Sequence, residues 1–167
     1  MYDELTKEDI EKMREELDYR TRVLRPQLID DVKTARAFGD LSENFEYKAA
    51  KREKNRNDSR VRYLERMIKT ARVISGESAG DVAGLYDQVT IRAEDDGSER
   101  VITLVTTLRQ NAPEGLISKE SPVGKAVLGR RAGERVYVKL GEDDGYYLDI
   151  LKIQKGSDDG SIPIRGY

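Results

Sequence analysis

The chain has 167 residues, and 37% of them are charged, well above the level of about 25% that is typical of soluble proteins. It contains no cysteine and no histidine, which excludes disulfides, thiol nucleophiles, zinc sites of the Cys/His type and a Ser-His-Asp triad. No apolar run approaches the roughly 18 residues of a membrane span, and the acidic segment 1–17 is unlike a signal peptide. We therefore expect a cytoplasmic protein with no membrane segment.

The net charge of −2 conceals a strongly basic segment inside an acidic chain. Residues 48–72 carry ten Lys/Arg and three Asp/Glu, a local balance of +7. Residues 1–47 balance at −5 and residues 73–167 at −4. One segment of helix length is therefore basic, and it needs either acidic partners within the protein or an anionic partner outside it.

The first half of the chain has the apolar spacing of helices. Residues 10–24 and 28–38 carry apolar side chains three and four positions apart, but the second stretch is shifted by one position around Pro26. Proline is accepted in the first turn of a helix, where its missing N–H costs no hydrogen bond, so we expect a new helix there. Thr6 and Asp9 have the spacing of a capping box at the first helix start.

A second apolar stripe follows a short polar break at 39–43. Over residues 47–71 the positions three and four apart are mostly apolar. Lys54 and Asn57 interrupt the stripe. In the interface between the two helical arms, called the seam below, they would either loosen the middle or fix the register. Two stripes joined by about five residues predict an antiparallel coiled-coil hairpin, which we assign to residues 1–76.

The second half of the chain changes to β-type sequence. Residues 77–87 are rich in Gly, Ser and Asp and predict a linker. Ser121 as N-cap and Pro122 as first helical residue predict one short helix. We expect a small antiparallel sheet with this helix over residues 88–155, a loosely ordered tail over 156–167, and α + β as the fold class. The expected strands cover 88–93, 100–107, 135–140 and 146–153.

Two carboxylate residues, Asp40 and Glu43, lie in the break between the two arms. Their spacing has the form of a capping box, and Gly39 suits the left-handed end of a helix, so a purely structural role accounts for them. A functional interpretation is also open. A long arm cannot apply its tip to its own globular domain, so chemistry at the tip would take place inside a partner.

The stretch "ARAFGDLSENFEYKAAKREK" (35–54) closely resembles the signature of the bacterial transcript cleavage factors, the GreA/GreB family. The first arm with its Arg-Pro break, "RMIKTARVI" and "GLISKESPVGKAVLGRRAGERVYV" extend the resemblance over nearly the whole chain. Leu41 resembles the GreA branch. Phe38 and Phe45 depart from the commonest form of the signature and add apolar surface beside the tip. The resemblance implies a C-terminal domain with a fold like that of the FK506-binding proteins.

The resemblance also implies a function. The coiled coil would enter the secondary channel of RNA polymerase and stimulate the polymerase's own cleavage of the nascent RNA 3′ end in backtracked complexes. Asp40 and Glu43 would help to hold a Mg²⁺ shared with the polymerase and position water, so the protein needs no cofactor of its own and is not itself an enzyme. Mg²⁺ prefers six oxygen ligands, to which one or two carboxylates can contribute. The expected tip turn and contact residues are Gly39, Leu41, Ser42 and Asn44.

The basic segment has two interpretations. Lys48, Lys51 and Arg52, nearest the tip, would face the phosphates of the extruded RNA, as the resemblance implies for a basic patch on this domain. Alternatively, the basic residues pair across the hairpin, since like charges four residues apart destabilise a helix by a few tenths of a kcal/mol unless they find partners. The acidic candidates on the first arm are Glu15, Glu16, Asp18, Asp30 and Asp31.

Two other functions remain open at this stage. A family member could enter the channel and inhibit or compete rather than activate, although the presence of both Asp40 and Glu43 argues against this. The second alternative is a coiled-coil adaptor that has no role in catalysis. The resemblance implies that the C-terminal domain docks on the polymerase rim; prolyl isomerase activity does not follow from the fold alone. We expect a monomer.

Overall fold

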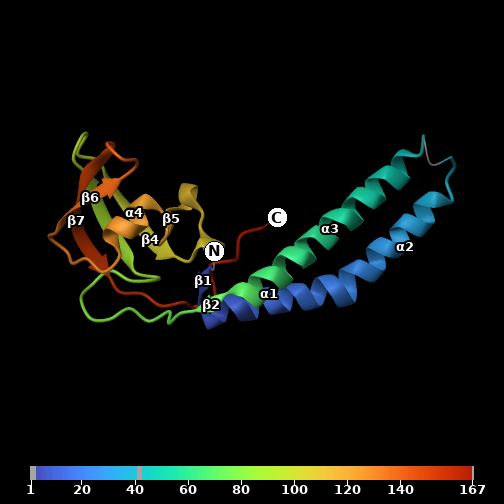
Figure 1. Cartoon of the computed structure of the whole chain (residues 1–167), viewed down its shortest axis with the longest axis horizontal. Helices are drawn as coiled ribbons and strands as arrows, with labels where there is room; N and C mark the ends of the chain where they lie inside the picture. The colour runs from blue at the N-terminus through green and yellow to red at the C-terminus, as the bar shows by residue number, and fades with distance from the viewer. Residues whose placement is uncertain (1–2, 41–42, 167) are drawn as a thin grey trace. The chain divides into compact units, whose positions relative to one another are not determined.

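The computed structural model describes residues 3–40 and 43–166, which form two compact units. The first unit, the hairpin, spans residues 10–71 and is mainly helical. The second, the sheet domain, combines residues 72–166 with the N-terminal residues 3–9. The fold class is α + β, a helical hairpin followed by a mixed sheet, as predicted (Figure 1).

The first arm of the hairpin is a single helical path that changes type in its middle. Helix α1 (Lys7–Tyr19) leads into a π-helical segment (Arg20–Leu24) and then into α2 (Arg25–Arg36), and the backbone stays right-handed helical across both junctions. Pro26 lies in the first turn of α2. A π-turn holds one residue more than an α-turn, which accounts for the one-position shift in apolar spacing. The proline therefore continues the arm instead of breaking it.

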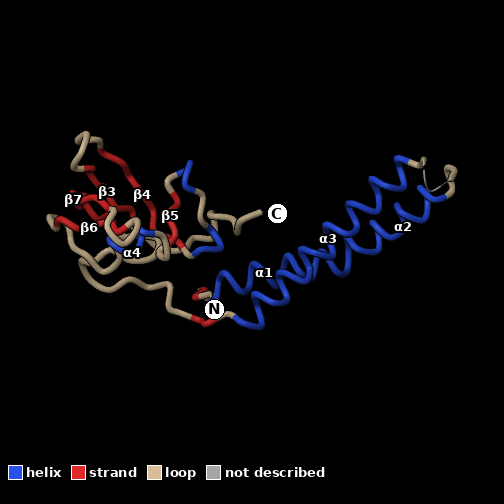
Figure 2. The backbone as a smooth tube through the Cα atoms, turned by 45° about the horizontal axis from the view of Figure 1, so that its top comes forward, coloured by secondary structure: helices blue, strands red, loops and turns tan. Residues whose placement is uncertain are grey.

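The second arm, α3 (Phe45–Thr70), packs against α2 and the π-helical segment, and both views show it running beside the first arm (Figures 1 and 2). The middle of the seam is polar. Asn57 Nδ2 donates to the Arg20 carbonyl at 3.2 Å, and Arg20 Nη1 donates to Asn57 Oδ1 at 2.9 Å. Arg60, which is 4% exposed, makes two hydrogen bonds to the Glu16 carboxylate at 2.8 and 3.0 Å. Asn57 therefore fixes the register of the arms.

The polar contacts between the arms affect the ionisation of Glu16. Burial raises the pKa of Glu16, but hydrogen bonds from Arg60 and Arg20 outweigh burial, so this pKa lies below its ordinary value. A second cross-arm pair joins Arg25 to Asp58 at 3.4 Å. Among the described residues of the hairpin, the buried apolar side chains are Met13, Ala35, Val61 and Leu64.

The start of α1 carries the predicted capping box. The Asp9 backbone N–H donates to Thr6 Oγ1 at 3.2 Å, and the Thr6 N–H donates to the Asp9 carboxylate at 3.1 Å. The same carboxylate accepts from Thr106 Oγ1 at 2.8 Å and from Arg109 Nε at 2.5 Å. Arg109 also pairs with Asp158 at 2.7 Å. The side chains of Asp9 and Arg109 are fully buried, so the first turn of α1 is part of the sheet domain.

The sheet domain contains a five-stranded sheet in the order β5-β4-β3-β7-β6, in which only β4 and β5 are parallel. Its strands are β3 (Gln88–Ala93), β4 (Glu99–Val105), β5 (Leu116–Ser118), β6 (Arg135–Lys139) and β7 (Gly145–Gln154). The four predicted strands correspond to β3, β4, β6 and β7. The short β5 was not predicted, and neither was the parallel pair of two-residue strands β1 (Glu4–Leu5) and β2 (Arg72–Val73).

Helix α4 (Pro122–Val127) packs on β6 and starts as predicted, with Ser121 Oγ accepting from the Gly124 N–H at 3.0 Å. Short 3₁₀ turns lie at Thr107–Arg109 and Ala112–Glu114. The core under the helix is apolar throughout. Its buried members are Ala83, Val89, Ile91, Ile102, Leu104, Val127, Val136, Val138, Leu148 and Ile150. None of the described helices is long and apolar enough to cross a membrane.

The segment 77–87, expected to be a linker, is packed into the sheet domain. Leu85 and Tyr86 are buried in a second apolar cluster together with Val105. Asp87 is fully buried and accepts hydrogen bonds from Lys155 and three further donors. Burial raises the pKa of the Asp87 carboxyl, but these donors outweigh burial and the pKa lies below its ordinary value. The compact units accordingly divide near residue 71 rather than at 76.

The expected tail, 156–167, also makes specific contacts where it is described. The Arg165 backbone N–H donates to the Leu108 carbonyl at 2.6 Å, and Arg109 Nη1 donates to the Ile162 carbonyl at 3.2 Å. Together with the Asp158 pair, these bonds hold the segment against the sheet domain. Its many Gly, Ser and Asp residues therefore form turns along a fixed path.

Candidate functional site at the hairpin tip

The tip of the hairpin is the turn between Arg36, the last residue of α2, and Phe45, the first residue of α3. Within it the Glu43 N–H donates to the Asp40 carbonyl at 3.3 Å, so one turn brings these two residues together. Both are exposed. Gly39 has a φ of +144°, a conformation that favours glycine. Leu41 and Ser42 lie outside the described residues.

Asn44, not Asp40, caps helix α3. Its Oδ1 accepts from the Tyr47 backbone N–H at 2.9 Å. Its Nδ2 donates to the Ala35 carbonyl at 2.6 Å, and the side chain is 7% exposed. One amide thus begins the second arm and ties it to the end of the first. Helix capping therefore leaves the presence of Asp40 and Glu43 unexplained.

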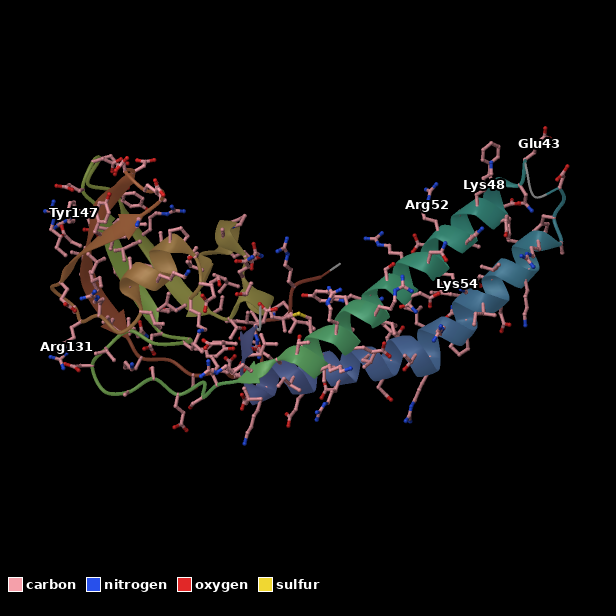
Figure 3. All side chains as sticks on the ribbon, in the orientation of Figure 1. Glu43, Lys48, Arg52, Lys54, Arg131 and Tyr147 are labelled. Atoms are coloured by element: carbon pink, nitrogen blue, oxygen red, sulfur yellow. The ribbon has the colours of Figure 1, made fainter. Side chains whose placement is uncertain are left out.

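The basic residues nearest the tip lie on an exposed face of α3. Lys48, Lys51 and Arg52 are exposed, and no acidic side chain in the described part of the chain forms an ion pair with any of them. Figure 3 shows Glu43, Lys48 and Arg52 along the same outer edge of the arm, whereas Lys54 lies between the two arms. A shallow, open groove follows this face. Its lining residues are Lys48, Lys51, Arg52, Asn55, Arg56 and Ser59.

The described ion pairs across the hairpin, Glu16 with Arg60 and Asp58 with Arg25, lie further from the tip. Glu16 pairs with Arg60, which is buried and so leaves the exposed basic face. Asp18 pairs within its own arm with Arg22 at 2.8 Å. Of the acidic candidates on the first arm, Glu16 is the one that forms a cross-arm ion pair among the described residues. Cross-arm pairing therefore accounts for Arg60 and does not account for Lys48, Lys51 and Arg52 among the described residues.

Aromatic rings accompany the cations at the tip. Phe45 is 81% exposed, and Lys48 Nζ lies 5.7 Å from the centre of its ring. The Tyr47 ring has the Arg36 guanidinium at 5.4 Å and Lys51 Nζ at 5.9 Å. A hydrogen bond from Arg36 lowers the pKa of the Tyr47 hydroxyl.

Two contacts at the tip could not be predicted from the sequence. The Asn44 bond to Ala35 joins residues nine apart across a turn, which no periodicity reveals. The contact between Arg36 and Tyr47 spans eleven residues in the same way. The available signal was Asn44 itself, since asparagine is among the best N-cap residues and directly precedes the second stripe.

The sheet domain has its own depression, with a volume of about 620 Å³. Apolar side chains of the sheet and of α4 form part of its lining; Asp95, Asp96 and Glu114 add acidic groups, and Arg100 adds a basic one. Tyr146 is the aromatic residue among its lining. This is a second concave surface, separate in chemistry from the basic face of α3.

Comparison with known proteins supports one class of protein for this combination of hairpin and sheet. Residues 4–73 match the family model "Transcription elongation factor, N-terminal", and residues 77–155 match "Transcription elongation factor, GreA/GreB, C-term". The class is that of the transcription elongation factors.

Comparison with individual relatives identifies the family within this class. The chain is 43% identical over 136 residues to transcription elongation factor GreA of Geobacillus kaustophilus, covering 81% of this chain and 86% of the relative. It is 39% identical over 135 residues to GreA of Bacillus subtilis, with the same coverage. The crystal structure of GreA factor homolog 1 (Gfh1) of Thermus thermophilus matches 93% of this chain and 100% of that one, at 24% identity and a TM-score of 0.43. The chain belongs to the GreA/GreB family of transcription elongation factors.

Proposed function

We propose that this protein inserts its hairpin tip into the secondary channel of RNA polymerase and stimulates the polymerase's own cleavage of the RNA 3′ end in backtracked, arrested complexes. The protein acts as an activator and has no nuclease activity alone. It works with the polymerase in the cytoplasm, as a monomer without a cofactor of its own.

The observation that carries this proposal is the pair of exposed carboxylates at the end of the arm. Asp40 and Glu43 are joined by one turn, and Asn44 performs the capping that would otherwise account for them. Ion pairs and hydrogen bonds of exposed carboxylates contribute little to stability. A pair of them presented at the tip of a helical hairpin is suited to completing a site that another protein supplies.

The two carboxylates fit a Mg²⁺ ion held jointly with the polymerase. Carboxylate oxygens are the ligands that Mg²⁺ prefers, and the ion is commonly held by one or two of them with other ligands from water or phosphate. In the described residues no group of three or more His, Cys, Asp or Glu side chains could hold a metal ion, so the tip supplies only part of a coordination shell. When bound, such an ion would stabilise charge on the attacking and leaving oxygens. Asp40 would act as ligand, and Glu43 would support it or orient the water.

The exposed basic face of α3 would guide the extruded RNA. Lys48, Lys51 and Arg52 are available to phosphates because no described acid pairs with them. Neutralising phosphates makes binding depend on salt concentration. Changing all three residues to Glu should reduce cleavage of deeply backtracked complexes more than of shallow ones, and should weaken the salt dependence of what remains. An equal loss on both substrates with a lower melting temperature would instead assign these residues a structural role.

The sheet domain would dock on the polymerase at the mouth of the channel. Its depression of about 620 Å³ combines an apolar sheet surface with three acidic side chains and one arginine, a chemistry that differs from the basic arm. A division of roles follows, in which the sheet domain contributes most of the affinity and the hairpin contributes the reactive groups.

The test is to add the purified protein to stalled, backtracked elongation complexes and to measure the release of short 3′ RNA fragments. Faster release that requires the polymerase supports the proposal. Binding without faster release would identify a channel binder that inhibits or competes, and neither binding nor release would leave a coiled-coil adaptor. RNA cleavage by the protein alone, with contaminating ribonuclease excluded, would contradict the assigned role as an activator.

A further inference from the structure

Phe45 presents an unusual surface at the start of α3. It has the highest exposure of the large apolar side chains in the described residues, at 81%. A single exposed apolar side chain is common on protein surfaces and needs no explanation by itself. This ring, however, lies 5.7 Å from the ammonium of Lys48, and both stand immediately beside the tip turn.

The position of Phe45 on the helix joins it to the basic groove. At 100° per residue, positions 45, 48, 52, 56 and 59 fall within roughly 80° of one another on the helix surface. Three of them, Lys48, Arg52 and Arg56, are basic, and the last four line the shallow groove. The acidic residue Glu46 projects about 100° away from Phe45. Phe45 therefore lies on the same helix face as the groove, between its lining residue Lys48 and the turn that carries Asp40 and Glu43.

An aromatic ring on the same helix face as a cationic groove suits a single-stranded nucleic acid. Proteins bind such strands with basic side chains along the backbone and aromatic rings on which bases stack. An apolar patch of another protein suits this surface less, because covering the ring would also remove water from the Lys48 ammonium, which has no acidic partner among the described residues. A nucleotide satisfies both groups at once, with a base for the ring and a phosphate for the ammonium.

We propose that Phe45 is a stacking platform for a base of the extruded RNA, and that Lys48 binds the adjoining phosphate. This inference rests on the proposed function and names the part of the substrate that the tip recognises. Because purines present a larger stacking surface than pyrimidines, the protein should act best on complexes whose extruded nucleotides are purines.

The first experiment uses the full-length protein and complexes backtracked on defined RNA, with adenine, uracil or an abasic residue at the extruded position. Phe45→Ala should raise the factor concentration needed for half-maximal cleavage at least about fivefold with adenine, the lower end of stacking contributions, and less than about twofold with the abasic residue. Phe45→Tyr should retain the preference for adenine. Phe38→Ala is the matched control, since Phe38 is a phenylalanine 69% exposed beside the other end of the turn.

Two results of this experiment overturn the inference. If Phe45→Ala loses as much activity on abasic RNA as on adenine, the ring contacts the polymerase instead of a base. If Phe45→Ala equals the unchanged protein on all three substrates while that protein stimulates cleavage, the stacking role fails and the proposed function stands.

The second experiment reads stacking directly and does not require cleavage. A 2-aminopurine at the extruded position should lose fluorescence when the protein binds, because stacking quenches this base. The inference is supported if Phe45→Ala abolishes this quenching and Phe38→Ala preserves it. This result supports the inference even if cleavage is not stimulated. Equal quenching by Phe45→Ala and the unchanged protein overturns it.

Discussion

The hairpin and the sheet domain are held together by different interactions. In the sheet domain ten buried apolar side chains form one continuous core. In the described part of the hairpin the buried residues include Asn44, Asn57 and Arg60, each bonded across the two arms. Apolar burial supplies most folding free energy, whereas buried polar pairs contribute little net stability but can fix one alignment.

The difference shows what each region must preserve. The sheet domain needs a stable, close-packed shape with a fixed surface. The hairpin needs a correct register, because a slip of its arms would move Asp40 and Glu43 away from the position set by the turn. Hydrogen bonds between one particular pair of residues, such as Asn57 and Arg20, define that register better than an apolar seam could. Four predictions test this contrast, in order of decreasing effect.

The largest effect is expected in the sheet domain core. Leu148→Ala removes a side chain that is 1% exposed and should lower the free energy of unfolding by about 3 kcal/mol. Hydrogen exchange should show lost protection in β3, β4 and β7, with less change in α3. An equal loss in α3 would show that the two regions unfold as one cooperative unit and would remove the contrast.

At the tip the expected effect is on activity alone. Asp40→Asn should slow stimulated cleavage roughly 100-fold, comparable to the loss of one charged group that stabilises a transition state. The melting temperature and the affinity for polymerase should stay nearly unchanged, because an exposed side chain of the same size is replaced. Glu43→Gln should weaken cleavage less. Cleavage by Asp40→Asn at the unchanged rate would refute the role assigned to this carboxylate.

The polar seam should make the hairpin sensitive to acid. The folded pKa of Glu16 lies below its ordinary value, so its contribution to stability is complete above about pH 5 and is lost as the pH falls through the folded pKa. Glu16→Gln should cost about 2 kcal/mol at pH 7, since it leaves the buried Arg60 without its carboxylate. Exchange in α3 measured between pH 7 and 3 checks this. A variant with the same acid sensitivity as the unchanged protein would contradict it.

The smallest effect is expected at the helix cap. Asn44→Ala should destabilise the hairpin by about 1 kcal/mol and increase exchange in the first turn of α3. Asn44→Asp is the matched control, because it keeps the acceptor for the Tyr47 N–H but cannot donate to the Ala35 carbonyl. If both variants equal the unchanged protein, the tie between the arms is unimportant.

Local signals predicted the elements whose determinants lie close together in sequence. The capping box of Thr6 and Asp9, the start of α4 at Ser121 and four strands of the sheet follow the expected pattern. The spacing around Pro26 predicted that a new helix begins there; α2 does have Pro26 in its first turn, but the π-helical segment joins it to α1 without a break. Each of these depends on residues within one or two turns of each other.

Features that depend on distant partners were beyond sequence reasoning. Residues 77–87 have the composition of a linker, but the buried Tyr86 packs with Val105 and Ile162, whose proximity no local pattern indicates. At the candidate site the two carboxylates were evident, whereas the choice of helix cap was not. Asp40 and Asn44 are both favoured cap residues, and the bond across the turn to Ala35 favours Asn44.

The buried carboxylate of Asp9 has a consequence for the order of events during synthesis. Its partners Thr106 and Arg109 follow it by 97 and 100 residues, and Lys119 follows its partner Glu4 by 115. At about 5–20 residues per second, the ribosome releases Arg109 roughly 5–20 s after Asp9. All of residues 10–71 emerge in that interval, so the two arms can close while the N-terminal segment is still hydrated. Glu4 and Asp9 thus leave the ribosome before the hairpin but reach their final place after it.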